Sequence, residues 1–181
     1  MSRKVTAHLF HSVNGVVESP NLFQFDSFGQ EEGEAMGSAI APVTDMVLGR
    51  KLWEEWSQYW PGNDDPFGSF INPLRKHVVS STLSGDLPWN STLVEGDPVS
   101  YVKSLRDNGA DGEISIGGGI ETIRSLFLAG VVDALTLTTH PVVTPDGRRL
   151  FDESVPLTRL QLVGSQITSN GNALLTYSLR D

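Results

Sequence analysis

The chain has 181 residues, of which 39% are hydrophobic, and its formal net charge is −9. This length and composition predict one compact domain over residues 1–181 with a sizeable core. The negative charge disfavours non-specific binding to nucleic acid, which needs clustered Lys and Arg. The absence of cysteine excludes disulfides, thiolate nucleophiles and cysteine-ligated metals. No stretch resembles a membrane span or a secretory signal, so we expect a cytoplasmic protein.

Short apolar runs alternate with amphipathic segments, which predicts an α/β fold with helices packed on a sheet. In the first half of the chain, strands are expected at residues 5–10, 45–49, 77–82 and 92–96. Helices are expected over residues 26–41, with Pro42 just beyond the end, and over residues 50–59. Residues 60–68 have the composition of a loop.

The clearest helix signals of the chain lie between Asp97 and Gly109. Asp97 suits the N-cap, Pro98 the first helical position, and Gly109 the position past the end. Further strands are expected at residues 113–117, 133–143, 159–167 and 173–179, which brings the total to about eight. A helix should begin near Ile120, and the Asn-Gly pair at residues 170–171 favours a hairpin between the last two strands.

Three predicted strands end in groups that suit an anion. Three glycines at residues 117–119 precede a helix, whose free N–H groups and dipole attract phosphate. Arg50 and Lys51 begin the helix after Gly49, where cations are unfavourable without an anion. Three hydroxyl side chains occupy residues 80–82. Each feature alone has an ordinary explanation, namely a tight turn, solvated cations or strand termination. Together they favour a phosphate site, because ligands of open α/β sheets bind beyond the carboxyl ends of the strands.

The four histidines, His8, His11, His77 and His140, lack the spacing of a metal site, so we expect none. His140 ends a strand facing the expected cleft. A partly buried, hydrogen-bonded role for it is favoured over substrate contact.

An aromatic cluster has helical spacing: Trp53, Trp56, Tyr59 and Trp60. Packing in the core or in a dimer interface is the favoured interpretation, and a lining for a flat heterocyclic substrate is the alternative.

Four segments and a C-terminal β-hairpin occur in an order that resembles the dihydrofolate reductase-like family. The segments are LGRKLWE, VVSST, SIGGGIETI and DALTLTTHPVV. More narrowly, the chain resembles the bacterial relatives of the riboflavin-biosynthesis reductase domain, and the resemblance covers nearly the whole chain. The opening HLFHSVNGVVES is similar to their first strand and substrate loop, although Asn14 replaces the Asp of the usual SLDG. The resemblance implies an α/β fold with an eight-stranded, mostly parallel sheet, flanking helices and a C-terminal hairpin.

The same resemblance implies that the protein binds NADPH. Leu52 stands where these reductases usually have a Thr whose hydroxyl contacts the cofactor. At this position only the backbone N–H of Leu52 could therefore bind the cofactor. A cis peptide bond is implied between Gly117 and Gly118. The residues implied to contact the cofactor are Gly49, Arg50, Lys51, Leu52, Ser80, Ser81, Thr82, Gly117, Gly118, Gly119, Ile120 and Glu121.

Reduction of a C=N or C=O bond requires a proton as well as a hydride. In the reductases that this chain resembles, an Asp or Glu near the start of the first helix is hydrogen-bonded to a Thr. That Thr corresponds here to Thr138. Asp26, Gln30 and Glu31 compete for the acidic position, and Asp26 is slightly favoured. Because the carboxylate has no clear equivalent, folate is not implied as the substrate.

The resemblance therefore implies an NADPH-dependent oxidoreductase, expected to be a homodimer, that reduces a pterin-, pyrimidine- or carbonyl-type small molecule. The alternative is a protein that retains the nucleotide pocket but has lost catalysis. The feature that favours this alternative is the absence of a clear proton-donor residue.

Overall fold

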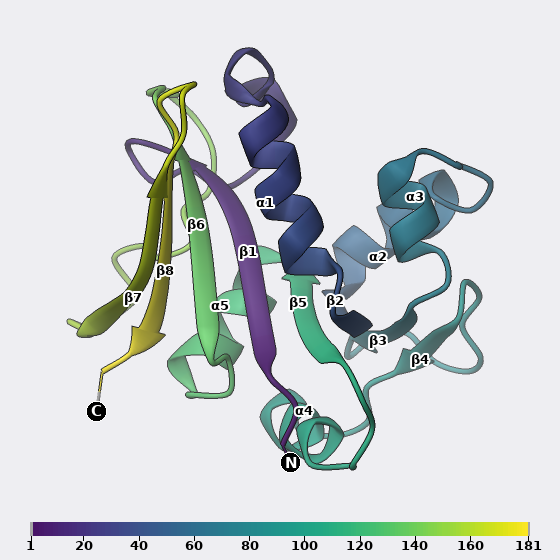
Figure 1. Ribbon diagram of the computed structural model, residues 1–181. Coiled ribbons are helices and arrows are strands. Elements are labelled where there is room, and N and C mark those ends of the chain that lie inside the picture. Colours follow the sequence, from purple (N-terminus) through teal and green to yellow (C-terminus); the bar gives the residue numbers. More distant parts are fainter. Residues whose placement is uncertain (1, 181) are drawn as a thin grey trace.

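The computed structural model describes residues 2–180 and contains one eight-stranded sheet flanked by helices (Figure 1). The strands are β1 Val5–Ser12, β2 Val43–Gly49, β3 Arg75–Val79, β4 Ser91–Leu93, β5 Glu113–Gly118, β6 Ala134–His140, β7 Leu160–Ile167 and β8 Ala173–Leu179. The α-helices are α1 Gln30–Ile40, α2 Arg50–Tyr59, α3 Pro66–Ile71, α4 Pro98–Arg106 and α5 Ile120–Leu128. Two 3-10 turns, Pro20–Leu22 and Phe25–Ser27, precede α1.

The strand order is β4-β3-β2-β5-β1-β6-β8-β7. The strands from β4 to β6 are parallel, whereas β8 pairs antiparallel with both β6 and β7. This arrangement confirms the predicted eight-stranded, mostly parallel sheet with a C-terminal hairpin. The carboxyl ends of β2, β3 and β5 lie at one edge, as parallel strands require.

Each face of the sheet has its own hydrophobic cluster. On one face α4 and α5 pack through Val102, Ile123 and Phe127 against the strands. On the other face α2 and α3 pack through Trp53 and Ile71. Helix α1 lies in front of the sheet in Figure 1 and buries only Glu32 among its residues. Its loose packing leaves room between α1 and the strands beside it.

The bounds or type of four predicted elements differ from the structure. The helix expected over residues 26–41 begins at Gln30, because Gly29 is its N-cap and donates its N–H to the Glu32 carboxylate at 2.8 Å. Part of the expected loop at residues 60–68 belongs to α3, where Asp65 caps the helix through the Gly68 N–H and Pro66 is the first residue. Strands β3 and β4 end earlier than expected, at Val79 and Leu93.

The aromatic residues of α2 belong mainly to the core. Trp53 is buried, and Trp56 and Trp60 pack against the same cluster. Tyr59 is 64% exposed and is the member that faces solvent. Packing, the favoured interpretation, therefore holds for the three tryptophans. Among residues 2–180, no helix combines the length and apolar character needed to cross a membrane.

Candidate functional site

A cavity of about 610 Å³ lies where β2, β3 and β5 end. The start of α2 after β2, the loop after β3 and the start of α5 after β5 all border it, as the strand-end pattern predicted. It brings together nine of the twelve residues expected to bind a cofactor, namely Gly49, Arg50, Lys51, Leu52, Ser80, Ser81, Gly119, Ile120 and Glu121. Thr82, Gly117 and Gly118 do not line it.

Two of the helices that begin at this cavity, α2 and α5, have no side-chain cap. The N-caps of α2 and α5 are Gly49 and Gly119, which offer no side-chain oxygen to the free N–H groups of the first turn. By contrast, Asp97 caps α4, whose first residue, Pro98, also lines the cavity, and Asp65 caps α3 away from it. Two positive dipole ends with free N–H donors therefore face the same space, which is the arrangement that binds phosphate.

The two helix starts approach each other closely because position 49 is glycine. A Cβ at Gly49 would lie 2.9 Å from Thr122 Oγ1 and 3.0 Å from the Gly119 nitrogen. These distances are too short for the neighbouring atoms to remain where they are. Gly49 thus sets the spacing between the ends of β2 and β5.

The three consecutive glycines serve three different purposes. Gly117 lies inside β5, where a Cβ would meet Met46 and Leu48. Gly118 has a φ of +150°, which side-chain-bearing residues rarely adopt. Gly119 has a φ of −65° and open space where its Cβ would be. Gly119 alone among the three borders the cavity, so close backbone approach to a ligand is possible there.

The cis peptide bond joins Gly118 to Gly119, one residue later than expected. The expectation for Gly117 and Gly118 was wrong because β5 continues through Gly118 and pairs there with Leu48. The junction between strand and helix is therefore displaced by one position.

The cations at the start of α2 differ in their surroundings. Arg50 Nη1 donates to both carboxylate oxygens of Glu54 at 2.8 and 2.9 Å, and Lys51 is exposed. A ligand phosphate would share Arg50 with Glu54 while Lys51 is free to approach it.

The hydroxyl group of Ser80 takes part in a local turn. Its oxygen accepts from the N–H groups of Thr82 and Leu83 at 3.1 and 3.0 Å. This is the ordinary strand-terminating role of a serine hydroxyl. Ser80 and Ser81 remain in the lining.

Arg148 also lines the cavity and was not predicted from the sequence. It comes from the long connection between β6 and β7, and its Nη2 lies 2.7 Å from Glu121 Oε1. Thr122 and Ser125 on α5 complete that side. The sequence contains little indication of this position, because nothing in the segment GRRLF shows that the side chain of Arg148 lies beside the ends of β2, β3 and β5.

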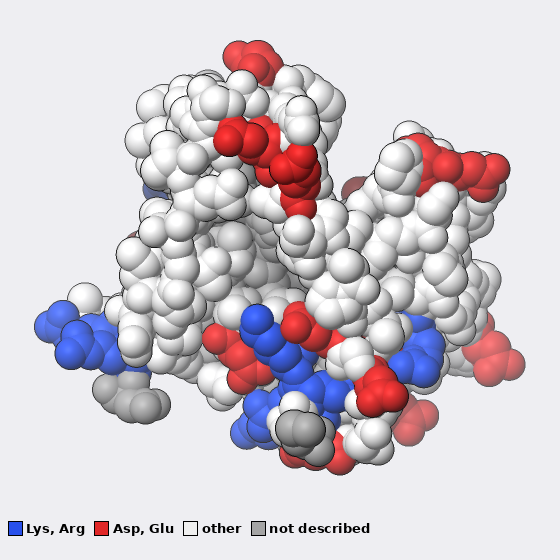
Figure 2. Space-filling model, in the orientation of Figure 1, with Lys and Arg blue, Asp and Glu red and all other residues white. Residues whose placement is uncertain are grey.

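A second cavity of about 530 Å³ lies between α1 and the strands β1, β6, β8 and β7. Figure 2 shows this face of the molecule hollowed beside α1. Its polar lining residues are His8, Glu31, Glu34, Ser38, Thr136, Ser165, Gln166 and Thr176. No Lys or Arg belongs to the lining, in contrast to the cavity at the strand ends.

The hydroxyl of Thr138 meets His8 instead of Asp26. His8 Nε2 lies 2.7 Å from Thr138 Oγ1, while Asp26 is exposed on the 3-10 turn before α1. The implied pair of Asp26 with Thr138 is therefore not formed, because α1 begins four residues after Asp26. Burial lowers the pKa of His8 to about 4, so its ring is uncharged at neutral pH.

His140 is fully buried, and its Nδ1 lies 2.6 Å from Ser27 Oγ. This agrees with the favoured interpretation of a hydrogen-bonded histidine. Within residues 2–180, no three His, Asp or Glu side chains are placed to hold a metal ion.

The chain is similar to several known proteins. It is 24% identical over 180 residues to the uncharacterized Bacillus subtilis (strain 168) protein YyaP, covering 97% of this chain and 94% of that one. A putative riboflavin biosynthesis protein from Shewanella sp. PV-4 has the same fold, with a TM-score of 0.75, 18% identity and full coverage of both chains. Dihydrofolate reductase from Enterococcus faecalis, complexed with NADP(H), has a TM-score of 0.61, 16% identity and full coverage of both chains.

The family model of the RibD C-terminal domain matches residues 3–174, which is nearly the whole described chain. This protein belongs to the RibD C-terminal domain family and has a dihydrofolate reductase-like fold.

Proposed function

We propose that this protein is an NADPH-dependent reductase of a pterin-, pyrimidine- or carbonyl-type small molecule. One observation carries the proposal: two uncapped helix N-termini and the cations Arg50, Lys51 and Arg148 meet in one cavity. The pyrophosphate of the cofactor would lie at the first turn of α5, where Gly119 leaves open space. The 2′-phosphate would lie near Lys51 and the hydroxyl groups of Ser80 and Ser81.

When bound, NADPH supplies a hydride to the carbon of a C=O or C=N bond, and a proton from solvent or a side chain completes the reduction. The chain's own part is to bind and orient both molecules. The second cavity suits the substrate, because its hydroxyl and amide groups can hold ring nitrogens and carbonyl oxygens. Thr138 is hydrogen-bonded to the uncharged ring of His8, which lines that cavity.

The alternative remains a nucleotide-binding protein without catalysis, and one observation favours it. Thr138 is hydrogen-bonded to His8. The expected pair of a carboxylate with Thr138, which would transfer the proton, is therefore not formed. A turnover assay separates the two functions. We expect oxidation of NADPH in the presence of at least one member of a panel of carbonyl compounds, pyrimidines and dihydropterins. Binding of NADPH with no turnover across the panel would support the alternative.

We also propose that the protein forms a homodimer. The tryptophans in and next to α2 pack in the core and are not available for a dimer interface. The outer strand β7, however, exposes Leu162, Val163 and Ile167. An outer strand with an apolar surface favours association with a second copy. Sedimentation at micromolar concentration should give twice the 19.7 kDa mass of one chain. The mass of a single chain at all concentrations would refute the dimer.

A further inference from the structure

We infer that Arg148 binds the pyrophosphate of the cofactor and that Glu121 holds this arginine when the cofactor is absent. The inference rests on the proposed function and adds a residue to the cofactor site. Arg148 lines the cavity at the strand ends, and its guanidinium forms an ion pair with Glu121 in the first turn of α5. The pair joins two segments that are 27 residues apart in the sequence.

The backbone of Arg148 is held in place from two directions. Its carbonyl accepts from the Val17 N–H at 2.9 Å, and its N–H donates to a Glu18 carboxylate oxygen at 3.1 Å. The carbonyl of the next residue, Arg149, accepts from Arg124 Nη2 of α5 at 2.9 Å. The segment is thus tied both to the loop after β1 and to α5 itself. Only the side chain of Arg148, 46% exposed, is free to change its partner.

The position of Glu121 explains why an exchange is needed. Its carboxylate lies in the first turn of α5, next to the free N–H groups that suit phosphate. An acidic group there is stabilised by the helix dipole, but it repels a pyrophosphate that approaches the same N–H groups. Arg148 neutralises it in the free protein.

Breaking this ion pair costs little. Glu121 is 78% exposed, and exposed ion pairs contribute little to stability. A guanidinium forms stronger, bidentate hydrogen bonds with phosphate oxygens. The cofactor can therefore take Arg148 from Glu121 without disturbing the fold. Because the pyrophosphate is common to NADPH and NADH, this contact should not discriminate between them.

The test compares Arg148→Gln and Glu121→Gln by fluorescence titration with NADPH and NADH. Loss of a charge-assisted hydrogen bond predicts that Arg148→Gln weakens binding of both cofactors by about tenfold or more. Glu121→Gln should strengthen binding of both, because it releases Arg148 and removes the repulsion. Arg148→Lys should recover only part of the affinity, since it cannot bind in bidentate fashion.

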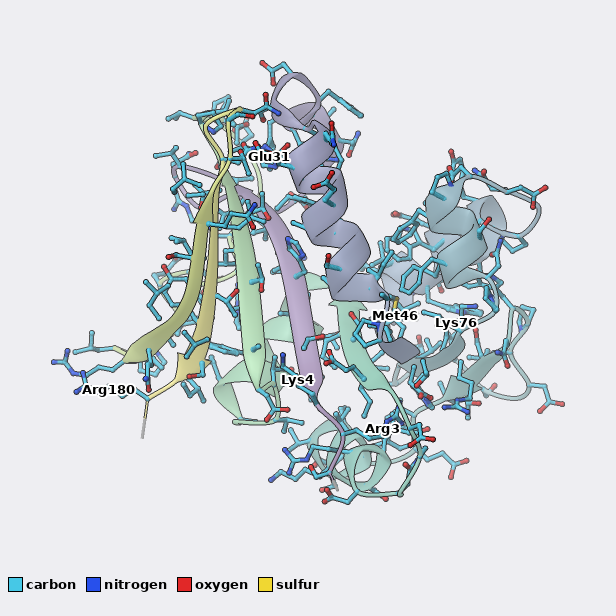
Figure 3. All side chains as sticks on the ribbon, viewed as in Figure 1. Arg3, Lys4, Glu31, Met46, Lys76 and Arg180 are labelled. Carbon is cyan, nitrogen blue, oxygen red and sulfur yellow. The ribbon has the colours of Figure 1, made fainter. Side chains whose placement is uncertain are left out.

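Arg180→Gln is the matched control, because Arg180 follows β8 and does not line the cavity at the strand ends (Figure 3). Thermal unfolding of each variant checks that the fold is intact. Unchanged affinity in Arg148→Gln, or weaker binding in Glu121→Gln, would overturn the inference while leaving the proposed function standing. Failure of the unmodified protein to bind either cofactor would instead refute the proposed function and this inference with it.

Discussion

Asp45→Asn should lower the free energy of unfolding by about 3–5 kcal/mol, the usual cost of removing one partner from a buried ion pair. Asp45 is 1% exposed and accepts hydrogen bonds from Arg3, Arg75, His77 and Thr44. Arg3 is itself 5% exposed, so its charge would stay buried without a counterion. Figure 3 shows Arg3 where the chain enters β1, far from α1.

The pH dependence of stability provides a second measure of this network. Burial alone would raise the pKa of Asp45, but the hydrogen bonds, first among them that from Arg75, hold the pKa well below its usual range. The unfolded chain binds a proton at this carboxylate near pH 4, whereas the folded chain does not, so stability falls as the pH drops below about 4. Above that pH the stabilisation is fully present.

Chemical denaturation from pH 3 to pH 7 would measure both effects. Asp45→Asn should be less stable at neutral pH and should lose less stability on acidification. Asp86→Asn, at an exposed position, is the matched control. A loss no larger than that of Asp86→Asn at pH 7 would contradict the role assigned to Asp45.

Gly49→Ala should weaken NADPH binding by about tenfold or more, which corresponds to about 1.4 kcal/mol or more. The new Cβ would lie against Thr122 Oγ1 and the Gly119 nitrogen, so the starts of α2 and α5 must separate. Overpacking of this kind costs about 1–3 kcal/mol, and here it acts at the point where the two helix N-termini face the ligand. The backbone of Gly49 itself suits alanine, since its φ is −72°.

Gly37→Ala provides the control for this substitution. Gly37 lies in α1 with open space around the position of a Cβ, so alanine there should leave affinity unchanged. It should also raise stability by about 0.5–1 kcal/mol, because alanine is the better helix former. Equal cofactor affinities for the two variants would show that the spacing of the helix starts does not matter for binding.

The sequence predicted most of the fold because the local signals agree with the tertiary structure. Asp97 and Pro98 begin α4 as expected. The same pair of residue types, Asp65 and Pro66, begins α3, but this helix was missed because its six residues are too few to show a helical periodicity. The cap residues alone did not distinguish this short helix from a loop.

The candidate site was predictable where it depends on backbone at strand ends, and less so where it depends on side chains from distant segments. Gly49 and Gly119 follow from strand-to-helix junctions. The approach of Arg148 to Glu121 depends on how the long connection after β6 folds back over the loop after β1. The contact of His8 with Thr138 depends on the register of β1 beside β6, which the sequence does not specify.

Titration of the unmodified protein with NADPH and NADH tests the cofactor assignment. We expect both to bind and NADPH to bind about ten- to a hundredfold more tightly, because the 2′-phosphate adds a charge-assisted contact with Lys51. Lys51→Gln should reduce this preference. Equal affinity for the two cofactors would contradict the assignment of Lys51 to the 2′-phosphate. Absence of binding to either would contradict the cofactor site itself.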